Sequence, residues 1–269
     1  MTPSLTSLFN TTRDALLLGG KIVKAGFDKA KRVRYKTATS PVTQVDIASE
    51  KAIIGLISKR FKDHTFLAEE TASVVEHNGR RKDSPYRWVI DPLDGTVNFI
   101  HGIPQTCVSI GVEQGGTVLA GGVCDPFRNE LFMAARGRGA TLNGRRISVS
   151  KETVPLRSLL ITGFPYDHQQ HSEKHAKILV PFLKSMADIR RFGSAAIDLS
   201  WVACGRAEAY FEFKLNPWDV AAGWLLVEEA GGKVSDCAGK RLDIENPVET
   251  VATNGRLHNK ILKNFLIGS

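Results

Sequence analysis

The sequence predicts an α/β fold of the layered α+β kind, in which helices cover β-sheets. Helix-like and strand-like segments alternate through the first part of the chain, which favours a layered mixed architecture over an all-α or all-β one. The chain has 269 residues, 42% of them hydrophobic, which is ample for a packed core. We expect one domain over residues 1–269, with an N-terminal α+β half over about 1–150 and a C-terminal α/β half over about 151–269.

The first elements are two helices joined by a loop. Apolar residues at helical spacing predict a helix from residue 4 to about 27. A basic stretch to Lys36 and the polar residues 37–41 then indicate a mobile loop, from which Lys36 can reach an anion. Residues 42–46 lead into a second helix, for which Thr43 or Asp46 is a natural N-cap because a short side-chain oxygen satisfies free backbone N–H groups. Capping alone would explain Asp46.

Two short strands follow, and acidic residues come directly after each. Residues 66–68 predict a strand that ends in Glu69-Glu70, of which only one should face a common site because adjacent strand residues point to opposite faces. Residues 87–90 predict a buried strand that ends at Asp91, since Pro92 bars its continuation. Hairpins are expected at Gly115-Gly116, between strands 107–113 and 118–123, and at Asn143-Gly144.

The second half predicts a strand at 159–162, a helix from about 197 to 203, and a strand at 209–213 with Tyr210 and Glu212 on one face. A strongly apolar helix then begins near Asp219, whose charge suits the first turn, and ends at Gly231-Gly232. A short final helix closes the chain. The three histidines in 168–175 favour a solvated loop and helix start over a metal site, and the glycines at 137 and 139 lack the pattern of a dinucleotide site.

Composition excludes several classes of protein. No apolar stretch approaches the roughly 20 residues needed to cross a bilayer, so no membrane association is expected. The four cysteines are widely spaced, which argues against a zinc cluster or disulfide framework and favours the cytoplasm. The net charge of +8, with basic clusters at 29–34, 80–82 and 136–138, can draw in phosphorylated molecules or nucleic acid, although a solvated surface is the simpler interpretation.

The stretch Asp91-Pro92-Leu93-Asp94-Gly95-Thr96 carries the strongest chemical signal. A turn after the strand lets Asp94 lie beside Asp91, and two carboxylates held together repel each other unless a cation lies between them. Oxygen-only ligands favour a hard cation such as Mg²⁺. Gly95 permits a close backbone approach to a ligand, and Thr96 adds a hydroxyl group. An ordinary turn would use the same residues.

Five runs make the sequence resemble the inositol monophosphatase family, within the lithium-sensitive, Mg²⁺-dependent phosphatase superfamily. They occur in family order and at family spacing, and they cover almost the whole chain: residues 68–70, 88–99, 139–144, 191–199 and 217–223. Asn98-Phe99 is similar to the inositol monophosphatase branch, whereas the phosphoadenosine phosphatase branch usually has Lys-Glu there. Ala68 departs from the glycine that many members have.

This resemblance implies a five-layer αβαβα sandwich of the inositol monophosphatase/fructose-1,6-bisphosphatase type and, commonly, a homodimer. It implies a first Mg²⁺ on Glu69, Asp91 and the Leu93 carbonyl, and a second on Asp91, Asp94 and Asp219, with a third, weaker ion near Glu69. Asp46 and Thr96 match the pair that orients the attacking water. Gly95 and Thr96 match phosphate-binding amides, and the alcohol portion of the substrate would contact Gly193, Ser194, Ala195 and Glu212. Lys36 matches a mobile loop near the metals.

The resulting hypothesis is a Mg²⁺-dependent phosphatase that hydrolyses inositol 1-phosphate by direct attack of water. Alternatives within the superfamily are fructose-1,6-bisphosphate, histidinol phosphate or phosphoadenosine phosphate as substrate. The spacing Asp-x-x-Asp disfavours the aspartyl-nucleophile route, which uses Asp-x-Asp. A different class of hypothesis is docking on RNA or the transcription machinery, as some bacterial relatives are reported to do.

Overall fold

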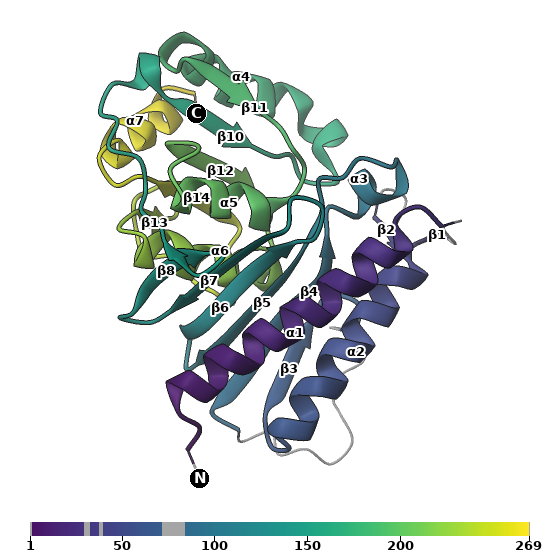
Figure 1. The fold of residues 1–269 in the computed structure, drawn as a ribbon. Coiled ribbons are helices and arrows are strands. Elements are labelled where there is room, and N and C mark those ends of the chain that lie inside the picture. The colour runs from purple at the N-terminus through teal and green to yellow at the C-terminus, as the bar shows by residue number, and fades with distance from the viewer. Residues whose placement is uncertain (1, 30–32, 38–39, 72–83, 269) are drawn as a thin grey trace.

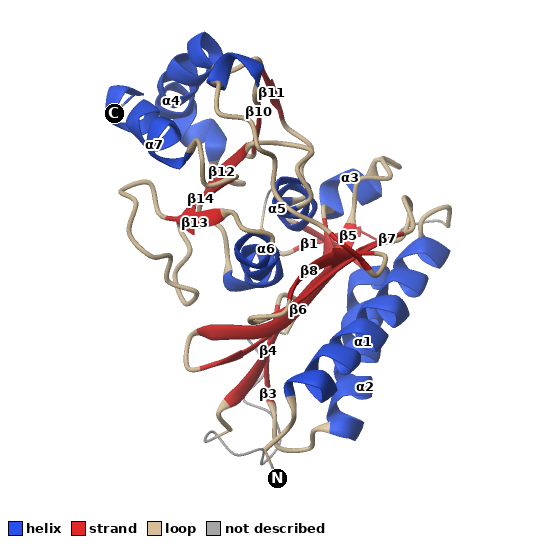
Figure 2. Cartoon of the chain, turned by 60° about the vertical axis from the view of Figure 1, so that its left-hand side comes forward, coloured by secondary structure: helices blue, strands red, loops and turns tan. Residues whose placement is uncertain are grey.

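The computed structural model describes residues 2–29, 33–37, 40–71 and 84–268, and it confirms the layered α+β fold. Helices and sheets alternate in five layers (Figures 1 and 2). Residues 30–32 of the basic cluster at 29–34, and the whole cluster at 80–82, lie outside the described residues. The division of the chain near residue 150 stays a prediction.

The first two layers are a helix pair and a seven-stranded sheet. Helices α1 (Leu5–Gly26) and α2 (Gln44–Arg60) pack side by side over one face of the sheet (Figure 1). Their buried faces meet the sheet in one apolar cluster, which includes Leu16, Ile53 and Trp88. The strands lie in sequence order: β3 (Thr65–Ala68), β4 (Tyr86–Asp94), β5 (Cys107–Gln114), β6 (Thr117–Asp125), β7 (Glu130–Ala135), β8 (Gly139–Leu142) and β9 (Arg145–Arg146). Among the described strands of this sheet, β3 and β4 pair in parallel and the other neighbours are antiparallel.

The third layer is a pair of buried helices, α5 (Ala195–Ala203) and α6 (Pro217–Glu229). Residues 220–227 of α6 are buried all round because sheets cover both sides of the helix (Figure 2). This explains the strongly apolar sequence of α6. The helix begins and ends where the sequence predicts, and Gly231 follows it in a left-handed conformation (φ 89°).

The last two layers are a five-stranded sheet and a second helix pair. The strand order is β11-β10-β12-β14-β13, with bounds Asp188–Arg190, Leu159–Thr162, Ala209–Phe213, Glu249–Thr253 and Lys233–Ser235. Helices α4 (Ser172–Ser185) and α7 (His258–Gly268) cover its outer face through a cluster that includes Phe182 and Phe211. Short 3-10 turns η1 (Pro155–Arg157) and η2 (His168–His171) lie before β10 and α4.

Two local predictions are wrong. Pro92 does not end its strand, because β4 runs on to Asp94. The pairing of β4 with β5 is interrupted between Asp91 and Asp94. Proline has no backbone N–H to donate, and in this interrupted part of the ladder none is needed. The stretch before Lys36 is not only a loop, since β1 (Val33–Tyr35) pairs with β2 (Pro41–Thr43). The Gly115-Gly116 and Asn143-Gly144 turns are confirmed, with φ positive at all four residues.

The structure also shows where the cysteines and the histidines of residues 168–175 lie. All four cysteines are free, two buried and two partly buried. Across the described ranges, no helix is both long enough and apolar enough to cross a membrane. The chain stretch at His168, His171 and His175 spans η2 and the first turn of α4, and His168 and His171 are exposed.

His258 makes the stability of this fold depend on pH. It is 1% exposed, and its two ring nitrogens lie 3.0 Å from the hydroxyls of Ser235 and Thr253. Burial, helped by Lys233, lowers its pKa to about 4. The unfolded chain, with a histidine pKa of about 6.5, therefore binds the proton more readily, and stability is lost as pH falls from about 6.5 toward 4.

We expect the advantage of wild type over His258→Gln in free energy of unfolding to shrink by about 3 kcal/mol between pH 7 and pH 4. Urea unfolding across this range measures it. The exposed His101→Gln serves as a control whose pH dependence should match wild type. Parallel curves for wild type and His258→Gln would contradict the assignment.

Candidate active site

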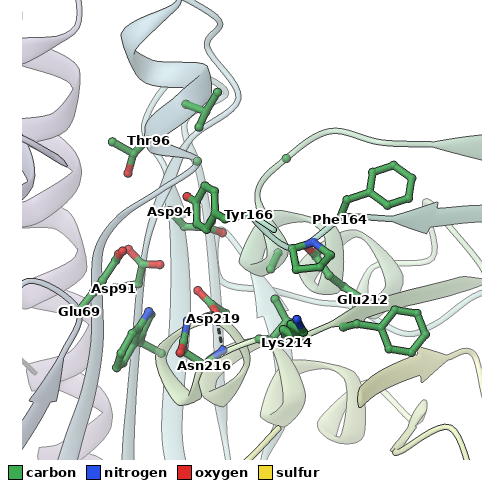
Figure 3. A pocket seen from close by; sticks show the side chains of 18 of the residues that line it. Glu69, Asp91, Asp94, Thr96, Phe164, Tyr166, Glu212, Lys214, Asn216 and Asp219 are labelled. Atoms are coloured by element: carbon green, nitrogen blue, oxygen red, sulfur yellow. Dashed lines mark hydrogen bonds between the residues drawn. The ribbon is translucent and has the colours of Figure 1, made fainter. Parts of the chain in front are cut away.

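One pocket lies where β4, α3 (Thr96–Ile100) and the starts of α5 and α6 meet the loop after β10 (Figure 3). It has a volume of about 130 Å³. Acidic, aromatic and basic side chains all line it. The lining includes ten of the residues singled out in the sequence: Glu69, Asp91, Leu93, Asp94, Gly95, Thr96, Gly193, Ala195, Glu212 and Asp219.

The interrupted end of β4 positions Asp91 and Asp94. Asp91 is 1% exposed, and its Oδ1 accepts a hydrogen bond of 3.0 Å from the backbone N–H of Leu93, which closes the turn. Asp94 Oδ2 accepts hydrogen bonds from Ser194 Oγ at 2.7 Å and from the N–H of Ala196 at 2.8 Å. Asp94 therefore joins the first sheet to the start of α5.

Asp46 and Thr96 form a hydrogen-bonded pair beside this turn. Thr96 Oγ1 lies 3.1 Å from Asp46 Oδ1 and 3.1 Å from the Leu93 carbonyl oxygen. The other oxygen of Asp46 accepts hydrogen bonds from the N–H and the hydroxyl of Thr43, so Thr43 and Asp46 make a capping box for α2. Capping and the contact with Thr96 thus use different oxygens of the same carboxylate.

Glu69 follows β3 and brings its carboxylate next to that of Asp91 (Figure 3). Lys36 Nζ lies 2.7 Å from Glu69 Oε1 and 3.0 Å from Glu70 Oε1. Partial burial opposes the charge of Lys36, but the two glutamates outweigh it and raise its pKa. Glu70 is not among the pocket residues, and its N–H donates to Glu50.

Asp219 and Glu212 complete the acidic surface from the C-terminal half. Asp219 Oδ2 accepts from the N–H of Asn216 at 2.7 Å, forming a capping box for α6. Glu212 accepts from the Tyr210 hydroxyl at 2.8 Å, as expected for two residues on one strand face. Its carboxylate lies so close to Gly163 that an added Cβ would be 2.0 Å from Oε2. A side chain at residue 163 would therefore require the Glu212 carboxylate to shift.

The carboxyl groups of the pocket carry poorly compensated negative charge. Burial first, and then the neighbouring carboxylates, raise the pKa values of Asp91 and Asp219 well above the usual range. Burial also raises the pKa of Asp94, against the hydrogen bonds from Ser194 and Ala196, and it raises the pKa of Glu69. For Glu212, burial raises the pKa to about 7. A buried cluster of oxygen donors with this excess of negative charge fits a hard divalent cation.

The side chains are not drawn together around one point. In the described part of the chain, no group of three or more His, Cys, Asp or Glu side chains is spaced to hold a metal ion. The fit to a metal therefore rests on the chemistry of the donors and on their burial, not on a preformed coordination shell.

Two of the singled-out residues lie behind the pocket. Asp46 is 0% exposed and reaches the pocket through Thr96, and Ser194 is 1% exposed with its hydroxyl directed at Asp94. Sequence reasoning gave no role to Phe164, Tyr166, Lys214 and Asn216, which line the pocket. The sequence did carry a signal for Phe164 and Tyr166, because both lie in the loop that follows strand 159–162, and loops at strand ends often carry functional residues.

The comparisons with known proteins identify the family. The family model described as the inositol monophosphatase family matches residues 4–267. The chain belongs to the inositol monophosphatase family.

Among curated proteins, the chain is 41% identical over 249 residues to the inositol-1-monophosphatase of Synechocystis sp., covering 92% of this chain and 85% of that protein. It is 42% identical over 241 residues to the Nus factor SuhB of Escherichia coli K12, covering 89% and 87%. The solved inositol monophosphatase of Anabaena superposes with a TM-score of 0.86 at 37% identity, covering 97% and 96%. Membership in the inositol monophosphatase family supports phosphatase activity.

The contact of Glu212 with Gly163 predicts a destabilising substitution. Gly163→Ala should lower the free energy of unfolding by about 1–3 kcal/mol, because the new Cβ must displace a buried carboxylate. Gly55→Ala is the control: nothing lies within 4 Å of its added Cβ, and alanine favours a helix by up to about 1 kcal/mol. Chemical denaturation measures both variants. Equal stability of Gly163→Ala and wild type would show that Glu212 does not occupy this position.

Proposed function

We propose that the chain is a Mg²⁺-dependent phosphomonoester hydrolase that releases phosphate from inositol 1-phosphate in the cytoplasm. The observation that carries the proposal is the cluster of four carboxylates, Glu69, Asp91, Asp94 and Asp219, around one pocket beside the Asp46–Thr96 pair. Hydrolysis of a phosphate monoester is among the slowest uncatalysed reactions. The negatively charged phosphate repels an incoming hydroxide, and this repulsion contributes to the barrier.

The four carboxylates and the Leu93 carbonyl oxygen would hold the metal. We assign Glu69, Asp91 and Leu93 to one Mg²⁺ and Asp91, Asp94 and Asp219 to a second, with a third, weaker site near Glu69. When bound, Mg²⁺ would offset the charge of the phosphate and act as a Lewis acid toward the attacking and leaving oxygens. Four carboxylates balance the charge of two divalent ions, so the occupied site would be close to neutral before substrate arrives.

The residues of the chain then hold and orient the reactants. Asp46 accepts the hydrogen of the Thr96 hydroxyl at 3.1 Å, which leaves lone pairs of Thr96 Oγ1 to accept a hydrogen bond from water in the pocket. The backbone at Gly95 and Thr96 lines the pocket where the phosphate would lie. Glu212, Gly193 and Ala195 would contact the alcohol portion, and Ser194 would keep Asp94 oriented.

Substrate identity is tested by a phosphatase panel with and without Mg²⁺. Inositol 1-phosphate, fructose-1,6-bisphosphate, histidinol phosphate and phosphoadenosine phosphate are compared at equal concentration. The proposal expects Mg²⁺-dependent release of phosphate, fastest from inositol 1-phosphate. If another member of the panel is hydrolysed with a higher kcat/KM, the assignment as a phosphatase stands and the assignment of inositol 1-phosphate as the substrate is wrong. A homodimer and lithium sensitivity, implied by the family resemblance, stay predictions.

A second candidate function is docking on RNA or the transcription machinery. It is favoured by the similarity to proteins named Nus factor SuhB and by the net charge of +8. RNA binding that weakens with salt and survives Asp94→Asn would support it as a role separate from catalysis. No salt-sensitive binding of RNA by wild type would argue against it.

Asp94→Asn should lower kcat by at least about 10²-fold, because an amide weakens a site whose charge stabilises the transition state by several kcal/mol. The measurement is steady-state release of phosphate at saturating Mg²⁺. Ser194→Ala, which removes only one hydrogen bond to Asp94, is the matched control and should lose less. Near-normal turnover in Asp94→Asn would contradict the assignment of Asp94 to a metal.

Asp46→Asn should slow turnover about 10²-fold while Mg²⁺ affinity, measured by calorimetry, stays near that of wild type. The reason is that Asp46 touches the reaction only through Thr96. Thr43→Ala controls for the capping box, since it removes the other side-chain contact of Asp46 without changing the contact with Thr96. Equal losses of turnover and Mg²⁺ affinity in Asp46→Asn would make Asp46 a ligand or a structural cap.

A further inference from the structure

Helix α2 presents a polar face to the first sheet, where its other buried contacts are apolar. Asp46, Ser49 and Glu50 lie at positions i, i+3 and i+4, which share one face of a helix. Their exposed fractions are 0%, 0% and 2%. Burying polar side chains costs free energy unless they are hydrogen-bonded. Asp46 is explained by its cap and by Thr96, whereas Ser49 and Glu50 take no part in the site as described so far.

Ser49 holds the turn between Asp91 and Asp94. Its hydroxyl donates to the Pro92 carbonyl oxygen at 2.9 Å. The N–H of Leu93, in the same peptide group, donates to Asp91 Oδ1 at 3.0 Å. This peptide group is therefore held on both sides, by Ser49 at its oxygen and by Asp91 at its nitrogen. It joins the two residues whose oxygens are assigned to the first Mg²⁺.

Glu50 holds the chain where β3 ends. Its Oε2 accepts a hydrogen bond of 2.9 Å from the backbone N–H of Glu70. The preceding N–H, that of Glu69, donates to the Ile90 carbonyl oxygen in β4 at 3.1 Å. Two successive N–H groups are thus fixed, one by the helix and one by the sheet. The backbone that carries the Glu69 carboxylate has little freedom to rotate.

The packing of α1 against α2 confines the Ser49 hydroxyl. A Cβ added to Gly19 of α1 would lie 3.1 Å from Ser49 Oγ and 2.8 Å from Ile53 Cδ1, so the two helices are in close contact at this level. The capping box of Thr43 and Asp46 fixes the start of α2. Ser49 and Glu50 therefore act from a rigid element, which is the arrangement that holds functional groups most accurately.

Stabilisation of the fold alone would also explain two buried hydrogen bonds. Their positions argue for more than that. Both go to backbone groups next to assigned metal ligands: the Pro92 carbonyl lies between Asp91 and Leu93, and the Glu70 N–H directly follows Glu69. Elsewhere α2 packs against the sheet through apolar side chains such as Ile53.

We infer that Ser49 and Glu50 are positioning residues for the metal ligands, Ser49 for Asp91 with the Leu93 carbonyl and Glu50 for Glu69. The inference rests on the proposed Mg²⁺-dependent function. Neither side chain is among the pocket residues, so each acts through the backbone that it holds. Loss of such outer partners typically costs about 10–100-fold in metal affinity or activity.

The test measures Mg²⁺ affinity by calorimetry, without substrate, in wild type, Ser49→Ala, Glu50→Ala and Glu50→Gln. Ser49→Ala and Glu50→Ala should each weaken Mg²⁺ binding about 10-fold, because the ligands lose their fixed orientation. Glu50→Gln keeps an oxygen that accepts the Glu70 N–H, so its affinity should stay close to that of wild type. The Mg²⁺ concentration that gives half-maximal release of phosphate should shift in the same way.

Two matched controls remove the same kinds of hydrogen bond away from the site. Ser158 is buried and its hydroxyl donates to the Val154 carbonyl oxygen at 2.8 Å. Glu208 is buried and accepts from the N–H of Leu159 at 2.7 Å. Ser158→Ala and Glu208→Ala should lose thermal stability without any change in Mg²⁺ affinity. Thermal unfolding without Mg²⁺ shows that each variant is folded and measures its loss of stability.

The outcomes separate this inference from the proposed function. If wild type binds Mg²⁺ and Ser49→Ala and Glu50→Ala bind it equally tightly, the inference is wrong and the metal site stands. Equal weakening in the two control variants would reduce the effect to general stability and overturn the inference. If Glu50→Ala does not fold, the comparison of Ser49→Ala with Ser158→Ala decides the result.

Glu50→Gln tests the stated cause. A loss of affinity as large as that in Glu50→Ala would overturn the positioning role of the Glu50 hydrogen bond, since the amide retains the acceptor. A wild type that binds no Mg²⁺ would overturn the proposed function and this inference with it. A wild type that binds Mg²⁺ with the expected order of variants but releases no phosphate would overturn the proposed function alone.

Discussion

The burial of several carboxylates around one pocket is the constraint on which the site depends. Burial raises the pKa values of Asp91, Asp94 and Asp219, and neighbouring carboxylates raise those of Asp91 and Asp219 further. Such a cluster opposes folding unless something offsets the charge. Hydrogen bonds from Ser194, Ala196, Leu93 and Asn216 offset part of it, and Lys36 lies against Glu69. The remaining negative charge is what makes the pocket suitable for a divalent cation.

Helix capping and the site use the same side chains. Asp46 is the third residue of α2 and caps it with Thr43, and Asp219 does the same for α6 with Asn216. In both cases one carboxylate oxygen is occupied by the cap. For Asp46 the other oxygen contacts Thr96. A helix start is thus a rigid position for a functional carboxylate, because the cap fixes its rotamer before any ligand binds.

The residues alone predicted a layered mixed fold, most elements and the turns, because apolar periodicity and glycine-containing turns are local signals. The five layers were implied by the family resemblance. The acidic residues follow strands or begin helices, where a turn or a cap would explain each of them alone, and only the resemblance to the inositol monophosphatase family joined them into one site. Sequence reasoning failed where tertiary structure overrode local preference: Pro92 is tolerated in β4 because the pairing is already interrupted there. Tyr166 and Lys214, which line the pocket, were missed because they lie on two loops that meet only in the folded chain.

The most direct test of the central claim is a crystal structure of the chain grown with Mn²⁺ in place of Mg²⁺, with anomalous scattering used to locate the metal. The account predicts two anomalous peaks that share Asp91, one also bound by Glu69 and the Leu93 carbonyl, the other by Asp94 and Asp219. Absence of anomalous density at Asp91, with Lys36 still against Glu69, would contradict it.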